Sequence, residues 1–238
     1  MSVVAHKLTN VVFDGIIASA KFSIFQWIIN KNMTTTVMVN DQGKRIMLQG
    51  MAHVAPKKFY ENIQTVMNDY TENQVFFEGV LAKGSAVENV SLDKLYKQFA
   101  IFLHNKKYNF VMQSDVLSHY GQHGDIMLKD YPEIEKSVIS MEQTFQSMEQ
   151  MLRGINEQGG KYFTEARVKE LTHEAQELDK GWMLDLRNQV CCEKVLESEE
   201  NSTLIPWGEE HIAGMQKIFE DSGFTVVSTK KTKIKSFV

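Results

Sequence analysis

The chain has 238 residues, and its 26 lysines and arginines nearly balance its 30 aspartates and glutamates, for a formal net charge of -4. This balance argues against a dedicated nucleic-acid binder, which normally carries a strongly basic face. Hydrophobic residues make up 43% of the chain, enough to bury a sizeable core without disulfides or metal clusters. The two cysteines, Cys191 and Cys192, are adjacent, so they supply neither a disulfide framework nor a thiolate metal site. We expect a globular cytoplasmic enzyme or binding protein.

The most apolar stretch covers residues 11–29, where Asp14, Lys21 and Gln26 interrupt it. Its hydrophobic residues recur at spacings of three and four, which is typical of a helix. The charges, and the lack of a basic region followed by a small-residue cleavage site, make it a poor membrane span and a poor signal peptide. We therefore expect a packing helix over residues 8–30, which is favoured over a helix that lies on a membrane surface.

The next segment predicts a hairpin followed by a βα unit. Two runs rich in β-branched and apolar residues, 34–40 and 45–50, flank a turn that contains glycine. Pro56 then stands where a helix would begin, and apolar residues at helical spacing follow it as far as Tyr70. Residues 74–79 form a short apolar run that predicts a buried strand. A strand, a helix and a strand of these lengths favour a largely parallel sheet.

The middle of the chain predicts helices. Residues 92–104 have helical periodicity, and 108–115 could form a strand. Two apolar stripes, 141–155 and 168–182, are separated by a pair of glycines, which predicts a helical hairpin or bundle. A ligand groove could produce the same stripes, but helix packing explains them equally well and is the default.

The C-terminal segment repeats the first pattern. A strand ends at Gly208, a helix ends at Gly223, and a further strand follows, so that Gly50 aligns with Gly208 and His53 with His211. We expect an α/β fold with a mixed, largely parallel sheet built from two βα halves. A single domain would span residues 1–238, with core halves at 33–83 and 201–238 and a helical insertion at 90–200. The lysine-rich run near the C-terminus predicts a solvated edge strand, rather than a contact with nucleic acid or anionic lipid.

Three predicted strand ends bring His53, Glu78 and His211 to one edge of the sheet. In open α/β sheets, ligands bind outside the carboxyl ends of the strands. Two histidines and a carboxylate suit zinc or another divalent metal. The alternative for each histidine alone is a surface or capping residue in a loop.

The segment around residues 113–125 is predicted to be a polar loop. His119 and His123 are four residues apart, a spacing at which two histidines of one helix can bind the same metal ion. Gly121 between them disfavours a helix. This loop could cover the site as a lid, with an inward-reaching side chain from among Gln113, Asp115 and Asp125.

These motifs carry a family resemblance. RIMLQGMAHVAPKKFYENI with QVFFEG resembles the opening of the TraB/PrgY/GumN/Tiki superfamily, in which a Gly-x-x-His precedes a strand-terminal glutamate. LIPWGEEHIAGMQKIFEDSGFTVV is similar to the second Gly-x-x-His of the superfamily, and DLRNQVCCEKV resembles its Arg-Asn helix motif, which places Arg187 and Asn188. The resemblance implies a mixed α/β fold with a helical insertion and a site formed by both histidines, the glutamate and the Arg-Asn pair.

The resemblance also implies a range of activities. Tiki members are metal-dependent proteases that use manganese or cobalt, and distant relatives include erythromycin esterases. TraB and PrgY members limit peptide pheromone signalling, and many carry membrane segments. This chain shows no such segment and no secretion signal, so we expect an intracellular bacterial or viral protein.

The residues themselves define the chemistry that the site could perform. A divalent metal (Mn, Co or Zn) held by His53 and His211 would lower the pKa of bound water, and Glu78 would be either a ligand or the general base. Arg187 could stabilise an oxyanion or hold a substrate carboxylate, and Asn188 could orient a ligand or a histidine. The alternative for this pair is a surface position on an amphipathic helix.

Two classes of function follow from this chemistry. The first is a metal-dependent hydrolase, in particular a peptidase, that acts on a peptide or a small molecule. The second is a non-catalytic protein that sequesters a peptide or metal in the same crevice. A metal-free esterase with a histidine base is a further alternative within the enzyme class. The sequence leaves open whether the protein forms a homo-oligomer.

Overall fold

The computed structural model describes residues 25–26, 28–78, 90–104, 109–117, 121–127, 130–158 and 181–237. Residues 25, 26 and 28–30 are helical. The rest of the helix expected at 8–30 lies outside the described residues, as does nearly all of the apolar stripe at 168–182. No described helix is both long and apolar enough to cross a membrane.

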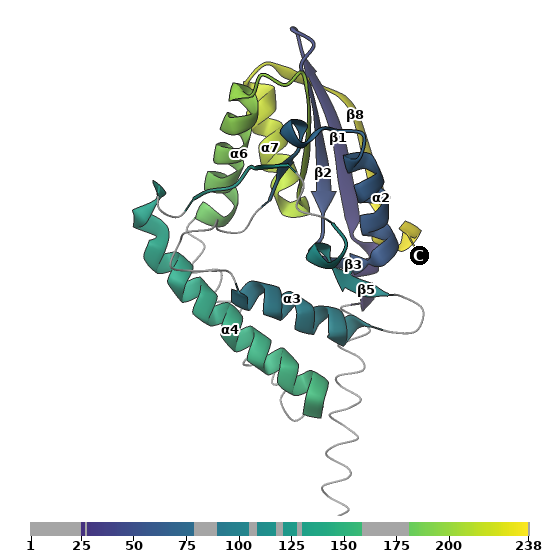
Figure 1. The fold of residues 1–238 in the computed structure, drawn as a ribbon, viewed down its shortest axis with the longest axis vertical. Helices are drawn as coiled ribbons and strands as arrows, with labels where there is room; N and C mark the ends of the chain where they lie inside the picture. Colours follow the sequence, from purple (N-terminus) through teal and green to yellow (C-terminus); the bar gives the residue numbers. More distant parts are fainter. Residues whose placement is uncertain are drawn as a thin grey trace, which may run out of the picture.

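A four-stranded sheet forms the centre of the fold, with the order β7-β2-β1-β8 (Figure 1). Its strands are β1 (Asn32–Asn40), β2 (Arg45–Met51), β7 (Ser202–Gly208) and β8 (Phe224–Lys233). The expected β1–β2 hairpin is confirmed, and the side chain of Asn40 accepts hydrogen bonds from the turn amides of Gln42 and Lys44. Strand β8 pairs with β1 at the end of the sheet, which confirms the edge strand predicted for the lysine-rich run.

The sheet is mixed, as expected, and includes parallel pairs. Strand β2 runs parallel to β7, and β4 (Phe76–Phe77) runs parallel to β6 (Gln122–His123). A parallel bridge between Val75 and Leu204 places β4 on the outer side of β7. Strands β2, β4, β6 and β7 therefore end on the same side.

The expectation of a largely parallel sheet is wrong. Three of the five described strand pairings are antiparallel. One is the β1–β2 hairpin, whose tight turn forces this orientation. The second joins β1 to β8. Strand β8 follows β7 and α7 in the chain, but it lies beside β1 and not beside β7. The third joins β3 (Val54–Pro56) to β5 (Phe110–Met112) in a separate small sheet.

Helices lie against both faces of the central sheet. On one face, α6 (Arg187–Glu197) and α7 (Glu209–Asp221) form a buried core with Ile46 of β2 and Trp207 of β7 (Figure 1). On the other face, α2 (Lys57–Met67) contributes Phe59 and Ile63 to a second core. This helix begins directly after Pro56, as its sequence predicts. The sheet is therefore the middle of three layers.

Two further helices, α3 (Val90–Leu103) and α4 (Glu135–Gln158), pack together beyond the end of the sheet (Figure 1). They confirm the helices predicted around 92–104 and 141–155. The strand predicted at 108–115 is shorter, because β5 gives way to a 3-10 turn, η2 (Gln113–Asp115). The remaining elements are short helical turns: η1 (Glu72–Gln74), η4 (Pro132–Ile134), η6 (Trp182–Leu186, a π-helical turn) and η7 (Ile234–Phe237).

Candidate functional site

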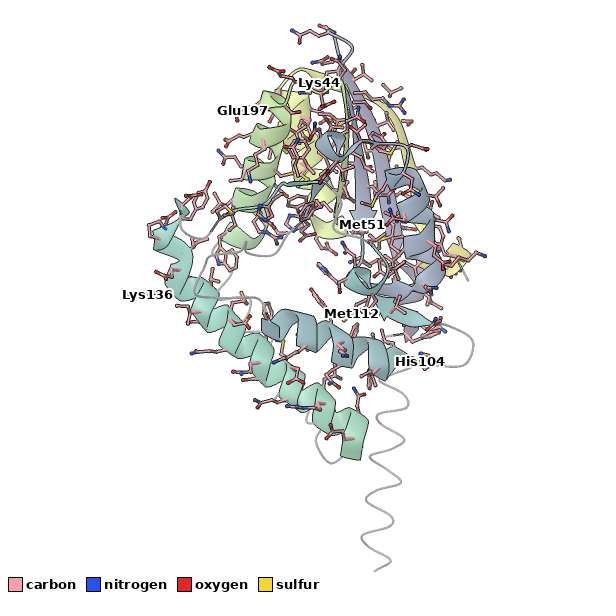
Figure 2. The ribbon with its side chains drawn as sticks, in the orientation of Figure 1. Lys44, Met51, His104, Met112, Lys136 and Glu197 are labelled. Atoms are coloured by element: carbon pink, nitrogen blue, oxygen red, sulfur yellow. The ribbon has the colours of Figure 1, made fainter. Side chains whose placement is uncertain are left out.

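Four chain segments deliver polar side chains to one edge of the central sheet. Glu78 directly follows β4, and His53 follows β2 by two residues. Asp125 follows β6 by two residues, and His211 lies in the first turn of α7, just beyond β7. Because these four strands run in the same direction, their carboxyl ends meet at this edge, where α/β proteins commonly bind ligands. Met51, at the end of β2, marks the edge in Figure 2, on the side that faces α3.

A buried charge cluster forms the centre of the site. The Nη2 of Arg187 donates to Oε1 of Glu78 over 2.7 Å and to Oδ2 of Asp125 over 2.6 Å, and its Nε donates to Oδ1 of Asp125 over 2.9 Å. The side chains of Arg187, Glu78 and Asp125 are 8%, 6% and 0% exposed. The surface alternative for Arg187 and Asn188 is therefore wrong, since both residues are buried at the start of α6.

Ion pairing within the cluster offsets the burial of Glu78 and Arg187. Burial alone would raise the pKa of Glu78, but Arg187 foremost, together with His53, the protonated form of His211 and the amide of Gly208, lowers it to about 2. Burial opposes the charge of Arg187 as well, but Asp125 and Glu78 raise the pKa of this guanidinium above its ordinary value. Two acidic side chains share one guanidinium, so the formal charge of the cluster is -1.

Both motif glycines allow a carboxylate to approach the backbone closely. The amide of Gly208 donates to Oε2 of Glu78 over 2.7 Å, and a Cβ on Gly208 would lie 3.2 Å from the same oxygen. A Cβ on Gly50 would overlap the carboxylate of Glu209, which accepts hydrogen bonds from the amide and hydroxyl of Thr34. Each Gly-x-x-His glycine thus provides space for an acidic side chain from another element.

The second motif histidine, His211, is neutral and is oriented by Asn188. Its Nδ1 lies 2.7 Å from Oδ1 of Asn188, and because an amide oxygen can only accept a hydrogen bond, Nδ1 is the nitrogen that carries the proton. Burial lowers the pKa of His211 to about 4, although Glu78 acts in the opposite direction. The lone pair is therefore on Nε2, which lies 3.7 Å from Oε1 of Glu78. A lone pair beside an ionised carboxylate favours a hydrogen-bond donor or a cation next to both.

The first motif histidine, His53, lies at the same edge but makes different contacts. Its ring stacks on Tyr96 of α3, with centroids 4.4 Å apart and planes 13° from parallel. Its charge acts on the pKa of Glu78 and, as the last of the causes, on the pKa of His211. In the part of the chain that the structure describes, no three His, Cys, Asp or Glu side chains form a group arranged to hold a metal ion. The edge therefore pairs His211 with Glu78 directly, whereas the ring of His53 stacks on Tyr96.

The predicted lid loop supplies one site residue. Asp125 reaches the cluster, and Lys194 of α6 holds its loop by donating to the carbonyl oxygens of His123 and Asp125, over 3.1 and 2.6 Å. Asp115 instead accepts a hydrogen bond from the nearby amide of Met112, and His119 lies outside the described residues.

The pattern in the sequence did not single out Asp125. Its strand, β6, is only two residues long, too short for a periodic signal. The sequence feature that could have pointed to Asp125 is its position one residue after Gly124, in a loop rich in histidine.

Comparison of the chain with protein-family models, curated proteins and solved structures gave no match.

Proposed function

We propose that the protein is a hydrolase that activates a water molecule at the Nε2 face of His211, with a divalent metal as cofactor and a peptide as the favoured substrate. The observation that carries this proposal is the pairing of a neutral, oriented imidazole with an ionised carboxylate, 3.7 Å apart at a sheet edge. The likeness of the motifs to the TraB/Tiki superfamily supports the peptidase assignment and stays part of the proposal.

Each side chain has a role that its contacts support. His211 presents a lone pair at Nε2, which can bind a metal or accept a proton from water. Asn188 fixes the tautomer that makes this lone pair available. Arg187 has its Nε and Nη2 on carboxylates, so we assign it to holding Glu78 and Asp125 in place, in preference to binding a substrate carboxylate.

The donor set fits a divalent cation in charge and in ligand type. His211 and Glu78, 3.7 Å apart, would supply two ligands, and His53, which forms no metal-holding group with them among the described residues, would have to supply the third; the metal would supply a bound water of lowered pKa. The negative formal charge of the buried cluster favours a cation, and the Asn188 contact to Nδ1 is the kind of partner that orients metal-binding histidines. The separate position of His53 favours the second candidate, a metal-free esterase in which His211 is the general base.

The test combines metal analysis with turnover. We would measure bound Mn, Co and Zn in the purified protein, and hydrolysis of a peptide library and of simple esters, with and without a chelator. His211→Ala should abolish turnover and lower metal content. His104→Ala, at an exposed histidine that follows α3, should change neither. Retained turnover in His211→Ala would contradict the proposal, and saturation at one equivalent without product would identify a binding protein.

Glu78→Gln distinguishes the two roles of the carboxylate. If Glu78 is a ligand, metal content and turnover fall together. If it is the general base, metal content holds while turnover falls by about a hundredfold or more. Turnover that resists the chelator would support the metal-free esterase.

A further inference from the structure

Strand β8 forms one edge of the central sheet, and both of its faces are open. The sheet order places it beside β1 alone, so its outer backbone groups pair with no strand in the part of the chain that the structure describes (Figure 1). Side chains alternate between the two faces along a strand, and a helix that covered one face would bury every second residue. All residues from 225 to 231 are exposed instead. Neither helix layer therefore covers this stretch of β8.

The first half of β8 has the composition of a strand that pairs. Residues 224–229 read FTVVST, without a charge, and valine and threonine favour strands. Val226 and Val227 are 39% and 64% exposed, although both are hydrophobic. The register with β1 shifts at this point, and Val227 is the residue without a partner on β1. A strand laid against this edge would satisfy its backbone groups and cover part of the two valines.

Charge divides the strand into two different ends. Two exposed acids, Glu220 and Asp221, end helix α7 just before β8 begins. Asp221 pairs with Lys217 over 3.0 Å, but both side chains are exposed, so water and salt weaken this pair. Exposed lysines lie near the other end of β8, at positions 230, 231 and 233. Lysines commonly keep an edge from pairing, but here they leave the uncharged half of the strand accessible.

We infer that β8 pairs with the β8 of a second copy of this chain, in antiparallel orientation, to form a dimer. Antiparallel pairing about a two-fold axis near Val227 joins the two uncharged halves. It also brings Lys231 and Lys233 of each copy toward Glu220 and Asp221 of the other. A parallel pair would set like charges side by side, which is destabilising. The two-fold axis uses the β8 edge of both copies, so the assembly closes as a dimer. This inference is independent of the proposed function.

Sedimentation velocity across micromolar concentrations tests the dimer. Wild type should approach twice the chain mass of 27.3 kDa as its concentration rises. Lys231→Glu combined with Lys233→Glu should raise the Kd of the dimer about tenfold or more, because the two-fold axis repeats each repulsion at both ends. The matched control combines Lys94→Glu with Lys97→Glu, at exposed lysines of α3, and should leave the Kd unchanged.

Two further variants test the orientation and the surface. Adding Glu220→Lys and Asp221→Lys to the variant with reversed lysines should restore dimerisation, because opposite charges then meet again. Val227→Cys should give a covalent dimer with a short bifunctional maleimide, since a two-fold axis nearby brings the two cysteines together. The native cysteines are buried and do not compete for the reagent. Leu196→Cys, at an exposed position of α6, is the control and should stay monomeric on denaturing gels.

Several results would overturn the inference. One is a wild type that stays monomeric at all concentrations, and another is a Kd that the reversed lysines leave unchanged. A reversal that the changes at Glu220 and Asp221 fail to rescue would contradict the antiparallel orientation. Equal crosslinking of Leu196→Cys and Val227→Cys would contradict the surface. A monomer that binds a labelled oligoglutamate peptide through the same lysines would assign the edge to an acidic peptide and would also exclude self-pairing.

Discussion

Replacing Arg187 by methionine would remove the cation that joins Glu78 to Asp125. All three side chains are at most 8% exposed, so water cannot take over the role of the guanidinium. Breaking one buried ion pair typically costs about 3–5 kcal/mol. Because one arginine serves two carboxylates here, we expect a loss near the top of that range, about 5 kcal/mol. In a chain of this size such a loss lowers Tm by about 10–20 °C.

The assay is urea unfolding at several pH values between 7 and 4, with circular dichroism as the probe of unfolding. Without Arg187, the pKa of a buried carboxyl should rise above its unfolded value. A group shifted in this direction stabilises the fold below its unfolded pKa and loses that contribution as pH rises through the folded pKa. The deficit of Arg187→Met should therefore shrink as the pH falls. Arg45→Met removes an exposed arginine of β2 and is the control, with an expected change within about 0.5 kcal/mol.

The reasoning fails if Arg187→Met loses less than about 1 kcal/mol at pH 7, the range of an exposed pair. It also fails if the deficit stays constant with pH.

Three further predictions use the same unfolding assay. Gly208→Ala should cost about 1–3 kcal/mol, because the new Cβ would press on Glu78 and on Cδ2 of His211 at 3.2 and 3.3 Å. Gly50→Ala should cost a similar amount by displacing Glu209 from the amide and hydroxyl of Thr34, and a loss under about 0.5 kcal/mol in either variant would contradict this account. In chelator-treated protein, His211 should lower the free energy of unfolding by about 3 kcal/mol as the pH drops from 6.5 to 4. Over this range the histidine is protonated in the unfolded chain but stays mostly neutral in the folded protein, where its pKa is lowered to about 4. His211→Gln should remove this slope, and an unchanged slope would show that another group causes it.

The local pattern of the sequence was enough to place several site residues at strand ends. The apolar run before Glu78 and the glycines before both histidines predicted where strands give way to the next segment. The position of a strand and the burial of its side chains are encoded locally, through side-chain alternation and turn residues. The hairpin, helices α2, α3, α4 and α7, and the edge strand β8 follow from the same signals.

Tertiary structure decided what these residues contact. Arg187 could have faced solvent, substrate or a carboxylate, and only the packing of α6 against the loop after β6 pairs it with Asp125. The proton position on His211 depends on Asn188, 23 residues earlier in the chain, and the ring of His53 stacks on Tyr96 of another helix. Contacts between distant segments depend on how whole elements pack. A strand of two residues, such as β6, is also too short for its sequence to show the alternation that predicts a strand. The sequence therefore placed Glu78 and both histidines at the sheet edge, whereas Asp125 and the partners, charges and orientations of these residues required the fold.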